Sequence, residues 1–362
     1  MKKQLLLGLV LGAALITSCS GSGSSDEADV VTYNKVNVSV DPSDLFSSYT
    51  FEDTKHGINI QDEFRTFNSE YGKYIQVRVL FYNKSTDLLV DSIVRYLSDT
   101  NTITEQISLP AGDYFAVTTL SFADKSNGDS WWVNVDREKM STSKLKPLNR
   151  MGCWSIMSHA SESLTVQRGD QNRLTAKPKP VGTLVYEFYE NFQYVSEQTY
   201  GTVADNNIRQ IALYNRTPGE SYNLDPRATN KFNYYADAGS NTWYYADVHR
   251  PAWFDSTWTF FKTNLYAYCY LMEPQAELTF GLMHDGETTF NAYGEKKYTL
   301  TSGKTFLAYW DYFKVGNPYF GEATNSKWNS YSKAPKVEPA FSKVLQAKPM
   351  EIGLESTLNY MK

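Results

Sequence analysis

Apolar and polar side chains alternate with a period of two along much of this chain, and this pattern constrains the fold most. In residues 36–40 the three valines fall on one face, and Asn37 and Ser39 fall on the other. Successive side chains of a β-strand point to opposite faces, so this segment is typical of a half-buried strand. Similar segments recur at roughly ten-residue spacing, with polar turns between them. The pattern predicts an all-β protein built from antiparallel β-sandwiches.

The alternation is clearest in the first third of the chain. Residues 75–82 and 88–96 flank a polar turn, which is the pattern of a β-hairpin. A second turn at residues 110–113 precedes another alternating strand at residues 114–120. We expect these strands to be neighbours in one antiparallel sheet.

The chain has 362 residues, which leaves room for two domains at about 150 residues each. A polar, Pro-bearing stretch at residues 167–180 is suited to a boundary between them. We therefore predict an N-terminal β-sandwich at residues 31–170 and a C-terminal β-sandwich at residues 177–325. Residues 326–362 carry scattered prolines and are expected to form a loop-rich tail.

The amino terminus has the features of an export signal. Two lysines precede an apolar run at residues 5–16, which is too short to span a bilayer and has the length of a secretory signal core. Aliphatic and small residues then lead directly into Cys19, which resembles the lipobox read by the bacterial lipoprotein signal peptidase. We expect a signal peptide at residues 1–18 and a lipidated Cys19. An ordinary signal peptide followed by an incidental cysteine is the alternative.

Residues 19–30 are expected to form a flexible tether. Residues 20–29 contain no apolar side chain larger than alanine, so they cannot bury enough surface to offset the loss of chain entropy. Their polar, acidic character resembles an export tag of surface-exposed lipoproteins, although a plain solvated linker has the same composition. We expect the protein to be anchored by lipid in the cell outer membrane and to face the extracellular side.

Charge and residue spacing exclude several classes of function. The net charge of -5 argues against nucleic acid as a partner, because phosphate binding needs a basic surface. The four histidines are far apart, the three cysteines cannot form a disulfide framework, and no nucleophile elbow or phosphate loop is present. We therefore predict no metal, no cofactor and no enzymatic activity.

The chain is rich in aromatic residues, with 27 Tyr, 19 Phe and 8 Trp. Adjacent aromatics on a strand point to opposite faces, so one can fill the core while its neighbour is exposed and free to stack on a sugar. Cross-strand packing within a Tyr-rich sandwich is the alternative. The residues with this pattern, which we consider candidate ligand contacts, are Trp131, Trp132, Trp243, Tyr244 and Trp253.

The order of these features resembles one known family. The lipobox, the acidic tether, the strand at residues 36–40, the run at 76–82 and the hairpin at 109–117 are similar to the first domain of fimbrillin-type lipoproteins of anaerobic Gram-negative bacteria. Stalk, anchor and tip subunits of pili belong to this family. The motif-like part of the resemblance is confined to residues 75–122.

The resemblance implies two transthyretin-like sandwiches in tandem, assembled by a donor strand that enters a groove of the next subunit. Stalk subunits of the family expose that groove after proteolysis near the first strand, and Arg65 lies in roughly that region. An uncleaved anchor or tip is equally consistent with the sequence.

The leading hypothesis is a surface structural or adhesive protein of the anchor or tip type, with other fimbrial subunits, a host surface or a glycan surface as partners. A glycan-binding surface lipoprotein of a polysaccharide-uptake system is the alternative, and an enzyme acting on extracellular polysaccharide comes third.

Overall fold

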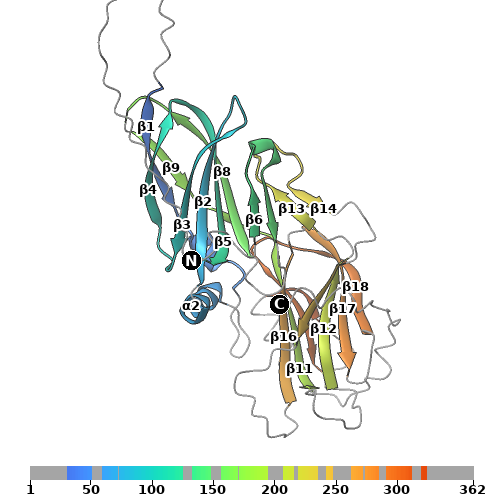
Figure 1. Ribbon diagram of the computed structural model, residues 1–362. Helices are drawn as coiled ribbons and strands as arrows, with labels where there is room; N and C mark the ends of the chain where they lie inside the picture. The colour runs from blue at the N-terminus through green and yellow to red at the C-terminus, as the bar shows by residue number, and fades with distance from the viewer. Residues whose placement is uncertain are drawn as a thin grey trace, which may run out of the picture. The chain divides into compact units, whose positions relative to one another are not determined.

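The protein is described by a computed structural model, in which contacts between Cα atoms divide the chain into two units, Met1–Thr32 and Tyr33–Lys362. We call the second unit the body. It consists almost entirely of β-strands, which confirms the predicted all-β class (Figure 1). No helix among the described residues has the length and apolar character needed to cross a bilayer. The described residues are 31–50, 59–71, 73–124, 133–147, 156–169, 171–194, 207–215, 219–234, 242–247, 262–271, 274–284, 291–311 and 319–323.

Two sheets pack against each other and form the first sandwich. One has the strand order β4-β1-β9, and the other has the order β10-β8-β5-β2-β3. Their bounds are β1 (Tyr33–Val40), β2 (Lys73–Asn83), β3 (Leu89–Leu97), β4 (Ile103–Pro110), β5 (Gly112–Asp124), β8 (Met157–Val166), β9 (Asn172–Ala176) and β10 (Lys179–Val181).

The core of this sandwich follows from the period-two pattern. Val36, Val38 and Val40 of β1 share one buried cluster with Val77 and Val79 of β2. Fully burying a valine stabilises the fold by about 1.5–3 kcal/mol relative to leaving it exposed, so these alternating positions hold the two sheets together.

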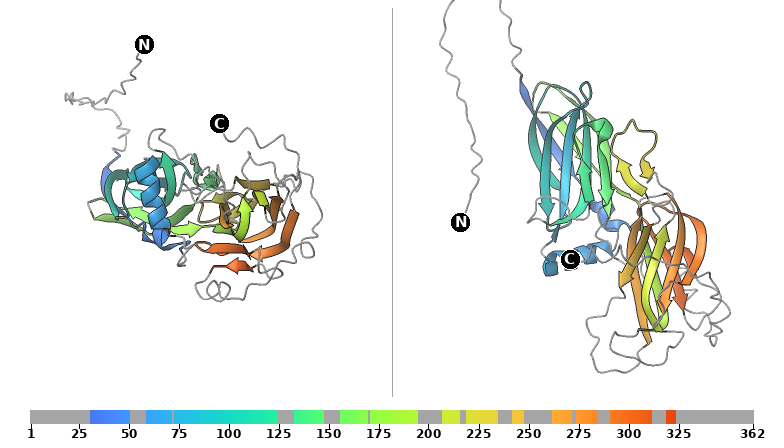
Figure 2. Two further views of the ribbon diagram at one scale, coloured as in Figure 1. Left: turned by 90° about the horizontal axis from the view of Figure 1, so that it is seen from below. Right: turned by 45° about the vertical axis from the view of Figure 1, so that its right-hand side comes forward.

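Two helices close one end of the sandwich. They are α1 (Ser43–Ser47) and α2 (Ile60–Tyr71), and α2 lies at the end opposite the start of β1 (Figure 2). Phe64 of α2 packs between Phe46 of α1 and Phe122 of β5, with ring centroids 5.5 Å and 6.1 Å away. The aromatic contact seals the core where the strands end.

A second sandwich is built from the eight strands β11 (Thr183–Tyr194), β12 (Asn207–Asn215), β15 (Thr242–Asp247), β16 (Lys262–Leu271), β17 (Gln275–His284), β18 (Asn291–Thr299), β19 (Thr305–Asp311) and β20 (Tyr319–Glu322). Pairing gives two four-stranded halves, β15-β12-β17-β18 and β16-β11-β19-β20. In the described residues the halves join where the end of β11 pairs with the start of β12. The two halves thus belong to one continuous eight-stranded sheet.

A third sheet covers the outer face of the first sandwich and was not predicted. Its order is β14-β13-β7-β6, and it combines β6 (Val133–Asp136) and β7 (Lys144–Pro147) with β13 (Gly219–Asn223) and β14 (Phe232–Tyr234). A short 3-10 helix, η2 (Met140–Thr142), precedes β7. Tyr222 of β13 packs edge-on against His159 of β8 at 5.4 Å. Strands from the second half of the chain therefore complete the cover of the first sandwich.

The predicted boundary at residues 167–180 is wrong as a linker, because it contains β9 and β10. Leu174 and Ala176 of β9 are buried, and β9 pairs in parallel with β1. The side-chain amide of Asn172 donates to the carbonyls of Lys35, Gln167 and Gly169 at 3.0–3.1 Å. These contacts satisfy the polar groups of the stretch within the fold. The chain leaves the first sandwich only at Gly182, and the division into two domains stays a prediction.

Tyr49, two residues after the end of α1, forms hydrogen bonds to the segments where β11 and β19 of the second sandwich begin. Its amide donates to the carbonyl of Gly303 at 2.7 Å, and its carbonyl accepts from the hydroxyl of Thr305 at 2.6 Å. Its own hydroxyl donates to the carbonyl of Gly182 at 3.2 Å. Tyr49 holds a left-handed backbone with φ of 57°, a conformation uncommon for a side chain of this size and supported here by three bonds.

Candidate functional site

The candidate site is the position that β1 occupies between two partner strands. β1 pairs antiparallel with β4 along its whole length, from Tyr33↔Pro110 to Val40↔Ile103. On its other side it pairs in parallel with β9, from Val36↔Asn172 to Val40↔Ala176. A strand in this position supplies hydrogen bonds to the backbone of both neighbours. Its removal would leave two strand edges unpaired across one slot.

The two faces of β1 differ in the way the sequence predicts. Val36, Val38 and Val40 are at most 2% exposed, whereas Asn37 and Ser39 are partly exposed on the other face. Across the outer face, the side-chain amide of Gln106 on β4 donates to Asn37 Oδ1 at 3.1 Å. Any strand in this slot must therefore present an apolar side chain at every second position.

The register defines the walls of the slot. Val38 lies between Glu105 of β4 and Leu174 of β9, and Val40 lies between Ile103 and Ala176. Most of these positions are apolar, so the floor of the slot is hydrophobic. With β1 removed, the slot would have the two properties that strand addition needs, namely unpaired backbone groups and pockets for alternate side chains.

Glu105 is the one charged residue among these four wall positions, and it forms an ion pair with a side chain of the other sheet. Arg95 of β3 donates from Nε and Nη2 to the two carboxylate oxygens of Glu105, at 2.5 Å and 2.9 Å. The hydrogen bond and charge of Glu105 raise the pKa of Arg95 above its usual value. A two-point Arg–carboxylate bridge fixes geometry, so it joins β3 to β4 at the rim of the slot.

A second charged cluster attaches the third sheet to the first sandwich. Arg227, in the segment between β13 and β14, bridges Asp225 and Asp87. Burial opposes ionisation of Asp225, but hydrogen bonds from Arg227 outweigh it and hold the pKa of Asp225 below its usual range. Burial would by itself raise the pKa of Asp87 as well. Hydrogen bonds from Ser141 and Arg227 outweigh this effect and lower the pKa of Asp87 below its usual value. This cluster has a structural role, because it joins the segment between β13 and β14 to Asp87 in the turn between β2 and β3.

The structure describes few of the predicted site residues. Trp243 and Tyr244 lie on β15, where the register pairs them with Tyr214 and Leu213 of β12. Four further candidates lie outside the described residues: Cys19, Trp131, Trp132 and Trp253.

Arg65, near which the resemblance places a cleavage region, lies on α2. Its guanidinium is exposed and forms an ion pair with Asp62 at 3.1 Å, one helical turn earlier. In the described part of the chain, His, Cys, Asp and Glu form no group of three that could hold a metal ion.

Sequence analysis missed β9, although a signal for it is present. In residues 172–176 the buried positions are Asn172, Leu174 and Ala176, and the exposed ones are Arg173 and Thr175. This is the same period-two pattern as in β1, but the strand is short and flanked by charged residues and prolines. Its parallel pairing with β1 joins segments more than a hundred residues apart, which no local pattern reveals.

Comparisons with known proteins give structural neighbours only. No family model matches the sequence, and no curated protein matches it. A candidate adhesin from Bacteroides ovatus has a similar structure, with 11% identity, a TM-score of 0.39 and coverage of 93% of this chain and 99% of that chain. The fimbrial anchor protein Mfa2 from Porphyromonas gingivalis is also similar, with 9% identity and a TM-score of 0.38. The match covers 81% of this chain and 96% of that chain.

The tip fimbrial protein Mfa3 from the same organism, truncated at its C-terminus, shares 9% identity at a TM-score of 0.37, covering 81% of this chain and 100% of that chain. These TM-scores are low, so the proposals below rest on the residues of this chain.

Proposed function

We propose that this protein is a lipid-anchored component of the cell surface, of the fimbrial anchor or tip type, which assembles by exchange of a β-strand. The observation that carries the proposal is the place of β1. It is the central strand of its sheet, its valines lie in the core, and it directly follows the tether that begins at Cys19. In this role the protein is structural or adhesive and needs no catalytic residues.

Strand exchange is physically favourable at this position. A donor strand from another subunit could pair with β4 on one side and β9 on the other, while its alternate side chains replace the three valines. Main-chain hydrogen bonds would supply affinity, and the apolar pockets would set the register. Because β1 continues into the tether, displacement of β1 need not break the chain or release the protein from its anchor.

Lipid anchoring is tested at Cys19. Replacing Cys19→Ser should abolish labelling with fatty acid and release a soluble, folded body, because a lipid anchor requires the thiol and the tether supplies no core contacts. Labelling in cells with radioactive palmitate, followed by fractionation, measures both effects. Persistent labelling of the variant would refute the lipoprotein assignment.

The fimbrial role is tested by purification from native membranes. The tagged protein, solubilised in mild detergent, should retain fimbrial subunits, and the Cys19→Ser variant should lose its membrane association but still fold. Recovery of the protein without any fimbrial subunit would contradict the assignment.

One described feature favours a second function, glycan binding within a polysaccharide-uptake system. Trp243 and Tyr244 are adjacent on β15, and adjacent positions of a strand belong to opposite faces of its sheet. If either ring binds sugars, a polysaccharide column should retain the protein, and either Trp243→Ala or Tyr244→Ala should abolish retention. Equal retention of both variants would exclude this site.

A further inference from the structure

Three large apolar side chains of the described body are conspicuously exposed. They are Tyr33 at 65%, Leu88 at 48% and Val90 at 41%. A single exposed apolar side chain is ordinary, whereas several at one place mark a contact surface.

These side chains lie at one end of the first sandwich. Tyr33 pairs with Pro110, whose carbonyl accepts a hydrogen bond from the hydroxyl of Tyr114 at 2.8 Å. The neighbouring Asp113 accepts from the amide of Lys84 at 2.9 Å, and the β2–β3 turn that begins there leads to Leu88. The start of β1 and this turn therefore belong to the same end, which we call the tether end (Figure 2).

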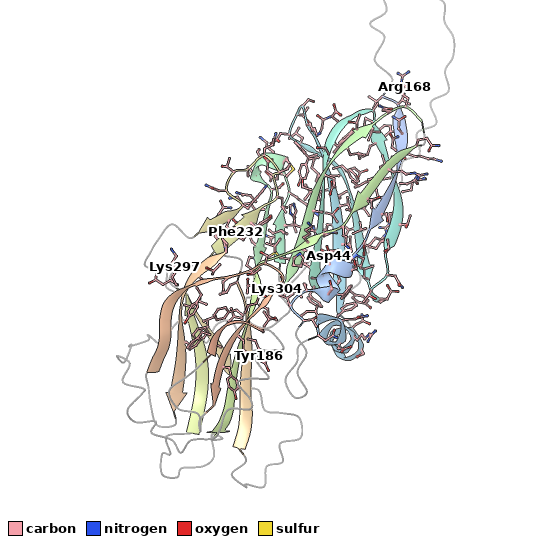
Figure 3. The ribbon with its side chains drawn as sticks, turned by 180° about the vertical axis from the view of Figure 1, so that it is seen from behind. Asp44, Arg168, Tyr186, Phe232, Lys297 and Lys304 are labelled. Carbon is pink, nitrogen blue, oxygen red and sulfur yellow. The ribbon has the colours of Figure 1, made fainter. Side chains whose placement is uncertain are left out.

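Exposed cations accompany the apolar side chains. Lys35 is exposed on β1, and Arg168 is exposed in the turn between β8 and β9. The next residue in that turn, Gly169, donates its amide to Asn34 Oδ1 at 3.2 Å, which places the turn beside the start of β1 (Figure 3). Of the acids nearby, Asp87 is held by Arg227, and Asp113 accepts from the hydroxyl of Thr165. Asp91, which follows Val90, is exposed and accepts from the amide of Ser92.

The length of chain between Cys19 and β1 limits how far this end can lie from a lipid anchor at Cys19. Residues 20–32 lie between Cys19 and β1, and a fully extended chain from Cys19 to Tyr33 spans at most about 50 Å. A flexible polar chain of the same length has a mean end-to-end distance of roughly 20 Å. The tether end is therefore the part of the body that a membrane-bound Cys19 would hold nearest to lipid.

We propose that the tether end rests on the headgroup region of the bilayer, with Tyr33, Leu88 and Val90 entering the interface. Tyrosine suits this depth because its ring is apolar and its hydroxyl is polar, and Lys35 and Arg168 would face lipid phosphates. This contact would orient the body so that α2 points away from the membrane. The inference rests on the proposed lipid anchoring, and the test below separates the two.

The test attaches the body to a bilayer without using Cys19. A chain that begins at Ser20 carries an amino-terminal hexahistidine tag and is held on phosphatidylcholine–phosphatidylglycerol vesicles that contain a nickel-chelating lipid. The reference is the same chain on nickel beads without lipid. Amide hydrogen exchange, read by mass spectrometry, should slow at residues 84–92 on vesicles and remain unchanged at residues 98–102, the turn at the opposite end of β3.

Two variants decide the cause of the protection. The triple variant Tyr33→Ser, Leu88→Ser and Val90→Ser should lose the protection, and it should stay folded because exposed substitutions change stability little. The matched control Lys297→Ser alters an exposed side chain on β18 and should retain it (Figure 3). Equal exchange on vesicles and beads, protection of residues 98–102 instead, or full protection in the triple variant would each overturn the proposal. None of these outcomes depends on whether Cys19 is lipidated.

Discussion

His159 is a single residue whose titration is strongly changed by its surroundings. Its Nε2 is shielded from solvent and has no hydrogen-bond partner among the described residues. Burial first, and the charge of Lys231 second, lower the pKa of His159 to about 4, against a smaller opposing effect of a hydrogen bond with the backbone of Leu224. Protonation would thus place a second cation beside Lys231 where the third sheet covers β8.

This environment predicts a dependence of stability on pH. The pKa of His159 is about 4 in the folded chain and 6.5 when unfolded, so below pH 6.5 the unfolded chain takes up the proton first. The free energy of unfolding should therefore fall as the pH drops from 6.5 to 4, by up to about 3 kcal/mol.

Urea unfolding of the parent and of His159→Gln at several pH values measures the effect. The parent should lose stability relative to His159→Gln across that window. A constant difference between the two would show that His159 does not titrate in this way.

At the scale of the element, β1 has two faces that should respond differently to the same charge. Val38→Asp places a carboxylate in the core, where Val38 is 2% exposed, and should lower the free energy of unfolding by at least about 3 kcal/mol. Asn37→Asp lies on the partly exposed face and keeps the oxygen that accepts from Gln106, so it should cost less than about 0.5 kcal/mol.

Denaturant unfolding followed by circular dichroism compares the two variants. Equal destabilisation by both would contradict the buried register of β1.

The elements that the sequence predicts well are those whose partners lie close in the chain. β2 and β3 form the expected hairpin. β1 is an exception, because its alternation predicts it although β4 and β9 are distant in the sequence. The sequence predicts a linker at β9, because the short apolar pattern of this strand lies among arginines, lysines and prolines. Its burial depends on pairing with β1, which no local pattern contains.

The third sheet was missed for a related reason. β13 pairs with β7, which lies in the other half of the chain. The sequence predicts β1 as a strand. It does not predict that β1 lies in the centre of its sheet, between β4 and β9.

For the whole molecule, the absence of a linker at residues 172–181 predicts resistance to proteolysis there. Both β9 and β10 are paired within sheets, and Tyr49 bonds the adjoining Gly182. Limited digestion of the chain that begins at Ser20 with a broad-specificity protease should remove the polar tether while residues 172–181 remain uncut. Early cleavage within residues 172–181 into two fragments of similar size would show instead that the boundary is exposed.

The central claim is that assembly requires β1 to leave its slot between β4 and β9. A disulfide between Asn37→Cys and Gln106→Cys would lock β1 to β4, because these residues face each other in the register and their side chains meet on the solvent face. The single variant Asn37→Cys serves as the matched control, since it cannot form the lock.

The decisive measurement is the amount of fimbrial subunit that co-purifies with the locked protein from native membranes. The account predicts loss of these subunits when the disulfide is formed, recovery after reduction, and parental levels for Asn37→Cys under both conditions. Parental levels of fimbrial subunits bound to the oxidised, locked protein would contradict strand exchange at β1.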